Sequence, residues 1–299
     1  MAKICSITLP VWAKRDSQES LLSQWSELIE EAAFDKPDLI LLPEICAQYH
    51  IPSEEYGNIN EPANGPLFQF FADKAAKHGC YIIAPAIIRT DGKLYNQAFV
   101  IDRNGQMMGS YRKNFPTYIE LDHGIEPGRE LPVFDTDFGK VAVVICFDMN
   151  FLEIGRELKK KNVKFICLST MAVFHLHMKW WAFEFQSYMI SAVSPGRKAQ
   201  IVNPFGNVIS ESSNYKPIMC KNIGSDFIVI PIISVNFNKM KAIKAAYGEN
   251  VKIDLCEEDG RILIAPVNNS VTTEELIKQF DLLLTDDYFN ESRLKCGRI

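Results

Sequence analysis

An apolar run that ends abruptly on a cysteine constrains this chain more than any other feature. Residues 141–145 form a continuous apolar segment typical of a buried strand, and residues 147–153 read as a turn that opens a helix. A sharp turn from strand to helix lifts the side chain of Cys146 out of the sheet and leaves backbone N–H groups unpaired beside it. Those groups can bind a developing oxyanion, and the helix N-terminus favours a thiolate. The pattern predicts a nucleophile at Cys146; the alternative is a buried structural cysteine.

Two charged residues occupy comparable positions upstream of this cysteine. Glu44 follows the apolar run of residues 38–43, whose final proline closes the strand because it has no N–H to donate. Lys113 ends the strand-like stretch of residues 109–113, before a loop that contains a proline. Each charge alone is typical of a solvated surface position. Together with Cys146 they give a carboxylate, an ammonium and a thiol at separate strand ends, which can converge where the ends of sheets meet.

The three segments, in this order, resemble the nitrilase superfamily of carbon–nitrogen hydrolases. They read Leu41-Leu42-Pro43-Glu44, Tyr111-Arg112-Lys113 and Ile145-Cys146-Phe147-Asp148-Met149-Asn150-Phe151-Leu152-Glu153, and Asn203-Pro204-Phe205-Gly206-Asn207-Val208 is similar to a late hairpin of the family. Three spaced motifs are more specific than any one of them, and the resemblance spans roughly the first four-fifths of the chain.

The resemblance implies a role for each member of this trio. Glu44 is the general base, Cys146 the nucleophile, and Lys113 stabilises the oxyanion together with the N–H of Phe147. Glu44 takes the thiol proton, returns it to the leaving amine, and then activates the water that hydrolyses the thioester. Neither a metal nor an organic cofactor is required, so the expected partner is a small-molecule substrate.

Several residues near the three segments are candidates for binding the substrate. By the resemblance, Glu120 lies where many members carry a further glutamate, and Glu126 is a nearby competitor for that position. The other candidates are aromatic or follow the cysteine directly: Tyr49, Phe147, Asp148 and Phe174. Phe147 and Asp148 resemble the amidase and carbamoylase branches, because nitrilases proper usually carry tryptophan and glutamate there. The acidic groups favour a neutral or amine-bearing linear amide or N-carbamoyl compound over a carboxylate-tailed one.

Other functions remain compatible with the sequence. Another cysteine hydrolase, such as a glutaminase-type or papain-like enzyme, needs a histidine base, and none of the five histidines lies in a supporting motif. An acyltransferase would use the same trio with a different acceptor. A non-catalytic binding protein on the same fold is a third possibility, against which the retention of all three residue types argues. His175 and His177 lack a third ligand motif, so no metal site is predicted.

Composition narrows the class of protein. The formal net charge of −5 comes without a basic stripe, so nucleic acid is not an expected partner. No apolar run approaches the length of a membrane span, and the N-terminus leads directly into a strand pattern without a signal peptide. The eight cysteines are scattered singly, which predicts small apolar side chains in a reducing compartment rather than a disulfide framework. A cytoplasmic enzyme is expected.

Alternating strand and helix signals predict a four-layer αββα sandwich, in which two stacked mixed sheets lie between outer helices. The resemblance implies the same fold. Residues 1–237 are assigned to the hydrolase domain, with a helix over 179–193 and a last sheet strand over 227–233. Residues 238–299 form an extension, with helices near 239–247 and 274–287, that packs on the same domain or across a dimer. A homodimer or higher homo-oligomer is expected.

Overall fold

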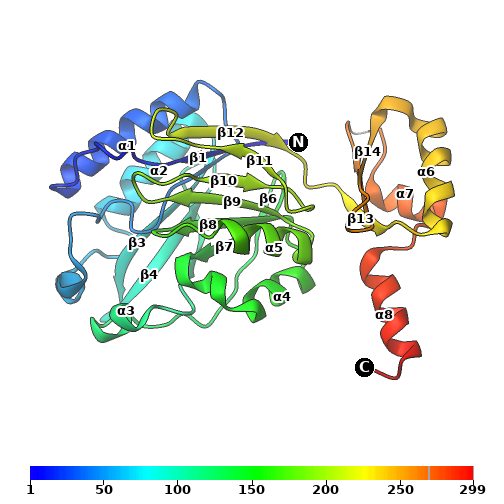
Figure 1. Ribbon diagram of the computed structural model, residues 1–299. Helices are drawn as coiled ribbons and strands as arrows, with labels where there is room; N and C mark the ends of the chain where they lie inside the picture. Colours follow the sequence, from blue (N-terminus) through cyan, green and yellow to red (C-terminus); the bar gives the residue numbers. More distant parts are fainter. Residues whose placement is uncertain (269, 299) are drawn as a thin grey trace. The chain divides into compact units, whose positions relative to one another are not determined.

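Two six-stranded sheets form the centre of the chain up to Ile223, in the computed structural model that describes residues 1–268 and 270–298 (Figure 1). The first sheet has the order β12-β1-β2-β3-β4-β5: β1 Ala2–Ile7, β2 Leu39–Leu41, β3 Tyr81–Thr90, β4 Lys93–Ile101, β5 Met107–Arg112 and β12 Ile218–Ile223. The second has the order β11-β10-β9-β8-β7-β6: β6 Phe134–Thr136, β7 Gly139–Ile145, β8 Phe165–Thr170, β9 Tyr188–Val193, β10 Gln200–Val202 and β11 Val208–Glu211. Three neighbouring strands run parallel in each sheet and the outer pairs are antiparallel, so both sheets are mixed.

Helices cover the outer face of each sheet. Helices α1 (Gln18–Ala33) and α2 (Pro66–His78) pack on the first sheet, and α4 (Leu152–Lys160) and α5 (His175–Phe185) pack on the second. A further apolar cluster draws residues from both sheets and fills the space between them. Because successive strand residues point to opposite faces, Ile4 belongs to that central cluster while Cys5 packs toward the helices. The predicted αββα sandwich is confirmed.

Hydrogen bonds between side chain and backbone join the two sheets across their interface. Ser6 Oγ in β1 donates to the carbonyl of Ser191 in β9 at 2.6 Å. Ser169 Oγ in β8 donates to the carbonyl of Leu42, just beyond β2, at 2.7 Å. All four residues are buried. The second bond holds the end of β2 against the end of β8, and β2 is the strand that leads to Glu44.

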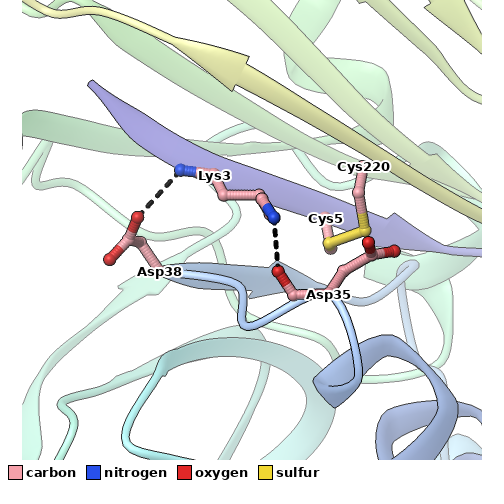
Figure 2. The surroundings of a disulfide bond; sticks show 5 residues. All are labelled: Lys3, Cys5, Asp35, Asp38 and Cys220. Carbon is pink, nitrogen blue, oxygen red and sulfur yellow. Dashed lines mark hydrogen bonds between the residues drawn. A yellow bond between two sulfur atoms is a disulfide. The ribbon is translucent and has the colours of Figure 1, made fainter.

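A disulfide between Cys5 and Cys220 joins strands β1 and β12 (Figure 2). The two residues are 215 positions apart and become direct antiparallel partners only through the register of these strands. The prediction that the cysteines are all unpaired is therefore wrong for this pair, because strand β12 was not recognised in the sequence. On the other side of β1, the backbone N–H of Lys3 donates to Asp38 at 2.8 Å, as Figure 2 also shows.

The chain from Gly224 onward forms a second compact unit. Its sheet has the order β13-β15-β14, all antiparallel, and its elements are β13 Ile228–Pro231, α6 Ser234–Tyr247, η3 Gly248–Asn250, β14 Val251–Cys256, β15 Arg261–Pro266, α7 Thr273–Phe280 and α8 Thr285–Lys295. Its core is a separate apolar cluster that includes Ile230, Ile243, Ile262 and Leu276. The unit therefore has its own apolar interior.

Four sequence predictions differ from this arrangement. The helix expected over 179–193 ends at Phe185, because Gln186 turns the chain with a left-handed φ of 52°, and β9 follows. The strand expected over 227–233 is β13, which pairs with β15 and not with either large sheet. The helix expected near 274–287 is two helices, α7 and α8, with Asp281 at a φ of 49° ending the first. The units divide at residues 223 and 224, upstream of the boundary placed after residue 237.

The helices of residues 1–268 and 270–298 are too short or too polar to cross a bilayer.

Candidate active site

Glu44 lies just beyond the carboxyl end of β2, in the first sheet. The next residue, Ile45, has a left-handed φ of 45°, an uncommon conformation for a β-branched residue and one that turns the chain sharply after the carboxylate. Glu44 is 3 % exposed. Its Oε2 accepts a hydrogen bond of 3.0 Å from the backbone N–H of Met171, which follows β8 of the second sheet. The carboxylate is therefore held by both sheets.

Lys113 follows β5 directly and is also buried, at 2 % exposure. Its Nζ lies 2.8 Å from Oε1 of Glu44 and 2.7 Å from Oε2 of Glu120. Burial lowers the pKa of the Lys113 ammonium, but the two neighbouring carboxylates outweigh burial and raise the pKa above its usual value. Lys113 is therefore a permanent cation between two acids.

Glu120 enters this cluster from the short helix α3 (Tyr118–Asp122). A capping box shapes the helix start, because the Thr117 hydroxyl accepts from the N–H of Glu120 while the Glu120 carboxylate accepts from the N–H of Thr117. Burial would raise the pKa of Glu120, but Lys113 and hydrogen bonds from Asn96 and Thr117 bring it below its usual value. The competing Glu126 is exposed and lines a separate polar cavity of about 440 Å³. Glu120 is the glutamate beside Glu44 and Lys113.

Asn96 is a member of this cluster that the sequence did not single out. It lies in β4 at 2 % exposure, and its Nδ2 donates to Glu44 Oε1 at 2.8 Å and to Glu120 Oε1 at 2.9 Å. The sequence shows two adjacent amides, Asn96 and Gln97, in the otherwise largely apolar stretch of residues 94–101. Such an amide is also compatible with a solvated strand face, so its position became clear only from the contacts.

Cys146 stands at the turn between β7 and the short 3₁₀ helix η2 (Cys146–Asn150), as the sequence predicts. Its φ of 45° is left-handed, a strained conformation of the kind that occurs at functional turns. Asp148, two residues on, is fully buried and holds this turn: Oδ2 accepts from the N–H of Ile145 at 2.9 Å and from the hydroxyl of Tyr111 at 2.7 Å. Its Oδ1 accepts from the N–H of Phe115 at 2.9 Å. These contacts place Asp148 within the scaffold, so the prediction that it binds substrate finds no support in this geometry.

The electrostatic surroundings of Cys146 keep its thiol protonated. Burial raises the pKa of the Cys146 thiol to about 12, and the negative charge of Glu44 adds to the rise. Lys113, the Thr170 hydroxyl and the backbone of Met171 oppose it. At neutral pH the sulfur therefore carries its proton, and it becomes a strong nucleophile only if a nearby base takes that proton during attack. The residues that affect this thiol include Glu44 and no histidine.

Aromatic side chains lie beside the thiol turn. Phe147 is 36 % exposed and packs edge to face against Phe151, with ring centroids 5.5 Å apart. Phe151 in turn stacks on Phe115 at 3.7 Å. Phe174 is half-buried and packs edge to face against His177 at 5.6 Å. The Phe147–Phe151–Phe115 group thus offers an apolar surface next to the reactive sulfur.

The remaining predicted residues have less direct connections to the cluster. Tyr49 is half-buried, and its hydroxyl is enclosed without a hydrogen-bond partner among the described residues. His175 Nε2 lies 3.0 Å from the carbonyl of Lys198. Within residues 1–268 and 270–298, no group of histidine, cysteine, aspartate and glutamate side chains has the geometry of a metal site.

Comparisons with known proteins identify the family of this chain. The model of the family described as carbon-nitrogen hydrolase matches residues 3–220, which lie entirely in the first unit. Omega-amidase NIT2 of Danio rerio is 26 % identical over 255 residues, covering 75 % of this chain and 91 % of that protein. A crystal structure of an amidase from Nesterenkonia sp. superposes with a TM-score of 0.68 at 16 % identity, covering 75 % of this chain and 91 % of that one. A variant of the Nesterenkonia sp. AN1 amidase, with acrylamide added to its active-site cysteine, has the same TM-score of 0.68 over 76 % and 94 % of the two chains. The protein is an enzyme that belongs to the carbon-nitrogen hydrolase family.

Proposed function

We propose that this protein is an amidase that cleaves a small linear amide or N-carbamoyl compound through a thioester on Cys146. The observation that carries the proposal is the buried pairing of Lys113 with Glu44 at 2.8 Å beside a protonated thiol. The Danio rerio relative is named an omega-amidase, and the superposed structures are titled amidases. These names support an amide as the substrate class.

The geometry supplies each group that amide cleavage needs. Glu44 accepts the thiol proton while sulfur attacks the carbonyl carbon, and the C=O electron pair moves to oxygen. Lys113 and the N–H of Phe147, at the start of η2, stabilise that oxyanion. Collapse breaks the C–N bond, and Glu44 gives its proton to the departing amine or ammonia. Glu44 then takes a proton from water, whose oxygen attacks the thioester carbon. The C–S bond breaks, the acid leaves, and Glu44 returns the proton to sulfur, which restores the thiol.

Glu44 is favoured over a histidine as base for electrostatic reasons. The groups that shift the pKa of the Cys146 thiol include the carboxylate of Glu44 and no histidine side chain. His175 bonds to a backbone carbonyl, and His177 packs against Phe174. An acyltransferase would keep the same first half-reaction and replace water by another acceptor. Product analysis with and without an added amine distinguishes these outcomes.

The charge of the cluster favours a neutral substrate or one that carries an amine. Glu44 and Glu120 contribute two negative charges and Lys113 one positive charge, so the three side chains together carry −1 while the thiol is neutral. A carboxylate on the substrate would be repelled at short range by this excess. The exposed ring of Phe147 suits an apolar acyl chain. We expect kcat/KM to be higher for substrates ending in a methyl or an amine than for matched ones ending in a carboxylate.

Replacement of Cys146 by alanine tests the proposal. We expect Cys146→Ala to abolish release of ammonia or amine from a panel of short aliphatic amides and N-carbamoyl compounds. The matched control is Cys167→Ala, which removes a fully buried thiol from β8 within the same domain and is expected to retain turnover. Iodoacetamide should label Cys146 faster than Cys167. Turnover by Cys146→Ala at the wild-type rate would rule out the thioester mechanism.

We further propose that the enzyme is a homodimer or a higher homo-oligomer. Helix α5 exposes large apolar side chains, among them Leu176 at 77 % and Trp180 at 42 % exposure. Symmetric association of the outer helices would cover this surface. Light scattering at micromolar concentration should therefore return a mass above the 34.0 kDa of one chain.

A further inference from the structure

Asn96 bonds to both carboxylates of the cluster and to the backbone of Lys113, although it carries no charge and takes part in no bond change. Its two amide hydrogens point to different acids, Glu44 Oε1 at 2.8 Å and Glu120 Oε1 at 2.9 Å. Its backbone carbonyl accepts from the N–H of Lys113 at 2.8 Å. One residue of β4 is therefore connected to both carboxylates and to the chain that carries the ammonium.

The other atom of the same amide shows that this arrangement is not optimal for Asn96 itself. Its Oδ1 is buried and accepts no hydrogen bond from any residue in the described part of the chain. Leaving a buried acceptor unpaired is destabilising. The orientation is nevertheless defined, because turning the amide over would place Oδ1 against two carboxylates. The side chain thus satisfies Glu44 and Glu120 at the expense of its own hydrogen bonding.

We propose that Asn96 is a positioning residue that keeps Glu44 and Glu120 ionised and correctly spaced around Lys113, so that Glu44 can accept the thiol proton. The inference rests on the proposed function, because it assigns Glu44 the role of base. Two carboxylates around one ammonium repel each other, and each becomes easier to protonate unless further donors favour its charged form. The two N–H bonds of Asn96 are such donors, and each acid receives one of them.

The groups that could contribute to a pH dependence here are few. The titratable side chains that contact the cluster or influence its charges are Glu44, Lys113, Glu120, Cys146, Asp148, Tyr49 and Tyr56. Burial raises the pKa of Tyr56 to about 12, and the pKa values of Tyr49 and Lys113 also lie above their usual ranges. The pKa of the Cys146 thiol is likewise raised above its usual value. Burial raises the pKa of Asp148 to about 6, but its carboxylate accepts from Ile145, Tyr111 and Phe115 and has no bond to Asn96. Its titration is therefore common to the wild type and the Asn96 variants, and a difference between their profiles reports the two acids that Asn96 contacts.

The test is the rate at which iodoacetamide alkylates Cys146 as a function of pH, followed on the Cys146 peptide by mass spectrometry. This rate reports deprotonation of the thiol by Glu44 and needs no natural substrate. Asn96→Leu removes the donors at similar volume, and Asn96→Asp keeps the shape but adds a third negative charge. We call the fall of this rate at low pH the acid limb of the profile. We expect the acid limb of Asn96→Leu to lie about 1 pH unit above that of the wild type, because loss of a hydrogen bond to a charged group has an effect of this size. The acid limb of Asn96→Asp should lie higher still, because this variant adds a negative charge. The kcat/KM profile for an accepted amide should move in parallel.

The matched control is Gln97→Leu. Gln97 is the next residue of β4, is equally buried at 2 %, and points to the opposite face, where its Oε1 accepts from Arg112. We expect its acid limb to coincide with that of the wild type. An unchanged limb in both Asn96 variants, or failure of both to fold, would overturn the proposal by showing that Asn96 serves stability alone. If the limb shifts while the wild type hydrolyses no amide of the panel, the proposed substrate class is wrong and the positioning role remains.

Discussion

Both units of this chain bury polar side chains, and each buries charge: the first a cluster of acids around a lysine, the second Arg261 in strand β15. In the first unit Glu44, Lys113, Glu120 and Asp148 are all at most 9 % exposed, and three of these four contact one another. In the second unit the buried Asn236 bonds to the backbone of Pro231 and Leu283, and the buried Thr285 bonds to the carbonyl of Val229. The first set holds charge in an apolar interior, whereas these residues of the second unit satisfy the backbone.

Buried ion pairs and buried neutral side chains differ in what they contribute to stability. Removing charge from water is expensive, and a buried ion pair is weak evidence for stability. A neutral side chain that completes backbone hydrogen bonds stabilises the fold at a lower desolvation cost. The two acids paired with Lys113 therefore point to catalysis, whereas Asp148, Asn236 and Thr285 hold the chain in place through their hydrogen bonds. The family match, which ends at residue 220, contains the two acids and Lys113.

The largest effects are expected from the charged set. Glu44→Gln removes the base and should lower kcat by at least about 10⁴-fold with little change in stability.

Lys113→Met should lower kcat by at least about 10³-fold and should also destabilise the protein by about 3–5 kcal/mol at pH 7, because two buried carboxylates lose their cation. Urea unfolding at pH 7 and pH 5 checks the cause, since protonation of the acids should restore part of the loss at pH 5. If Lys113→Met were as stable as the wild type at pH 7, the buried acids would not depend on Lys113, and the contrast between the two units would fail.

Replacing the neutral residue Asn236 should lower stability and leave catalysis unchanged. Asn236→Ala removes three hydrogen bonds to backbone groups and should destabilise the second unit by about 1–3 kcal/mol without changing kcat/KM. Hydrogen exchange followed by mass spectrometry should show lost protection in peptides beyond residue 224 and unchanged protection before it. Asn238→Ala is the matched control, because Asn238 lies in the same helix and is exposed. A fall in kcat/KM for Asn236→Ala alone would show that the second unit contributes to the reaction.

The smallest effect concerns the thiol and its pH dependence. Because the pKa of Cys146 rises from 9.0 to about 12 on folding, the native state binds the proton more tightly than the unfolded chain. Its contribution to stability is therefore complete below pH 9 and is lost as pH rises towards 12. Between pH 8 and pH 10, the wild type should lose about 1 kcal/mol more stability than Cys146→Ala, measured by urea unfolding at both values. Equal losses in the two proteins would indicate a thiol with an ordinary pKa.

Local patterns were sufficient for much of the first unit. Helix α1 begins one residue after the Ser17 cap, whose side chain accepts from the N–H of Ser20, and its buried Leu21, Trp25 and Ile29 recur every four residues. The apolar runs before Glu44 and Cys146 are short buried strands, as predicted. Such features depend on neighbours within a few residues, so they can be read from the chain directly.

Features that depend on distant partners could not be read in this way. Strand β12 pairs with β1, where Cys220 lies opposite Cys5 from 215 residues away, and β13 belongs to the second unit because its partner is β15. Asp148 follows the nucleophile in sequence, yet hydrogen bonds to Tyr111 and Phe115 turn its carboxylate into the scaffold. The sequence could not distinguish this orientation from one that faces a substrate.

The local pattern of an apolar run followed by one polar residue was enough to place a carboxylate, an ammonium and a thiol at strand ends, because it depends only on neighbouring residues. Only the tertiary structure decided which of these residues meet. It brought Glu44, Lys113 and Glu120 within hydrogen-bond distance, placed Glu126 elsewhere, and added Asn96. The physical reason is that burial and charge pairing are properties of the packed sheets. A carboxylate, an ammonium and an amide acquire their roles from the groups that surround them in space.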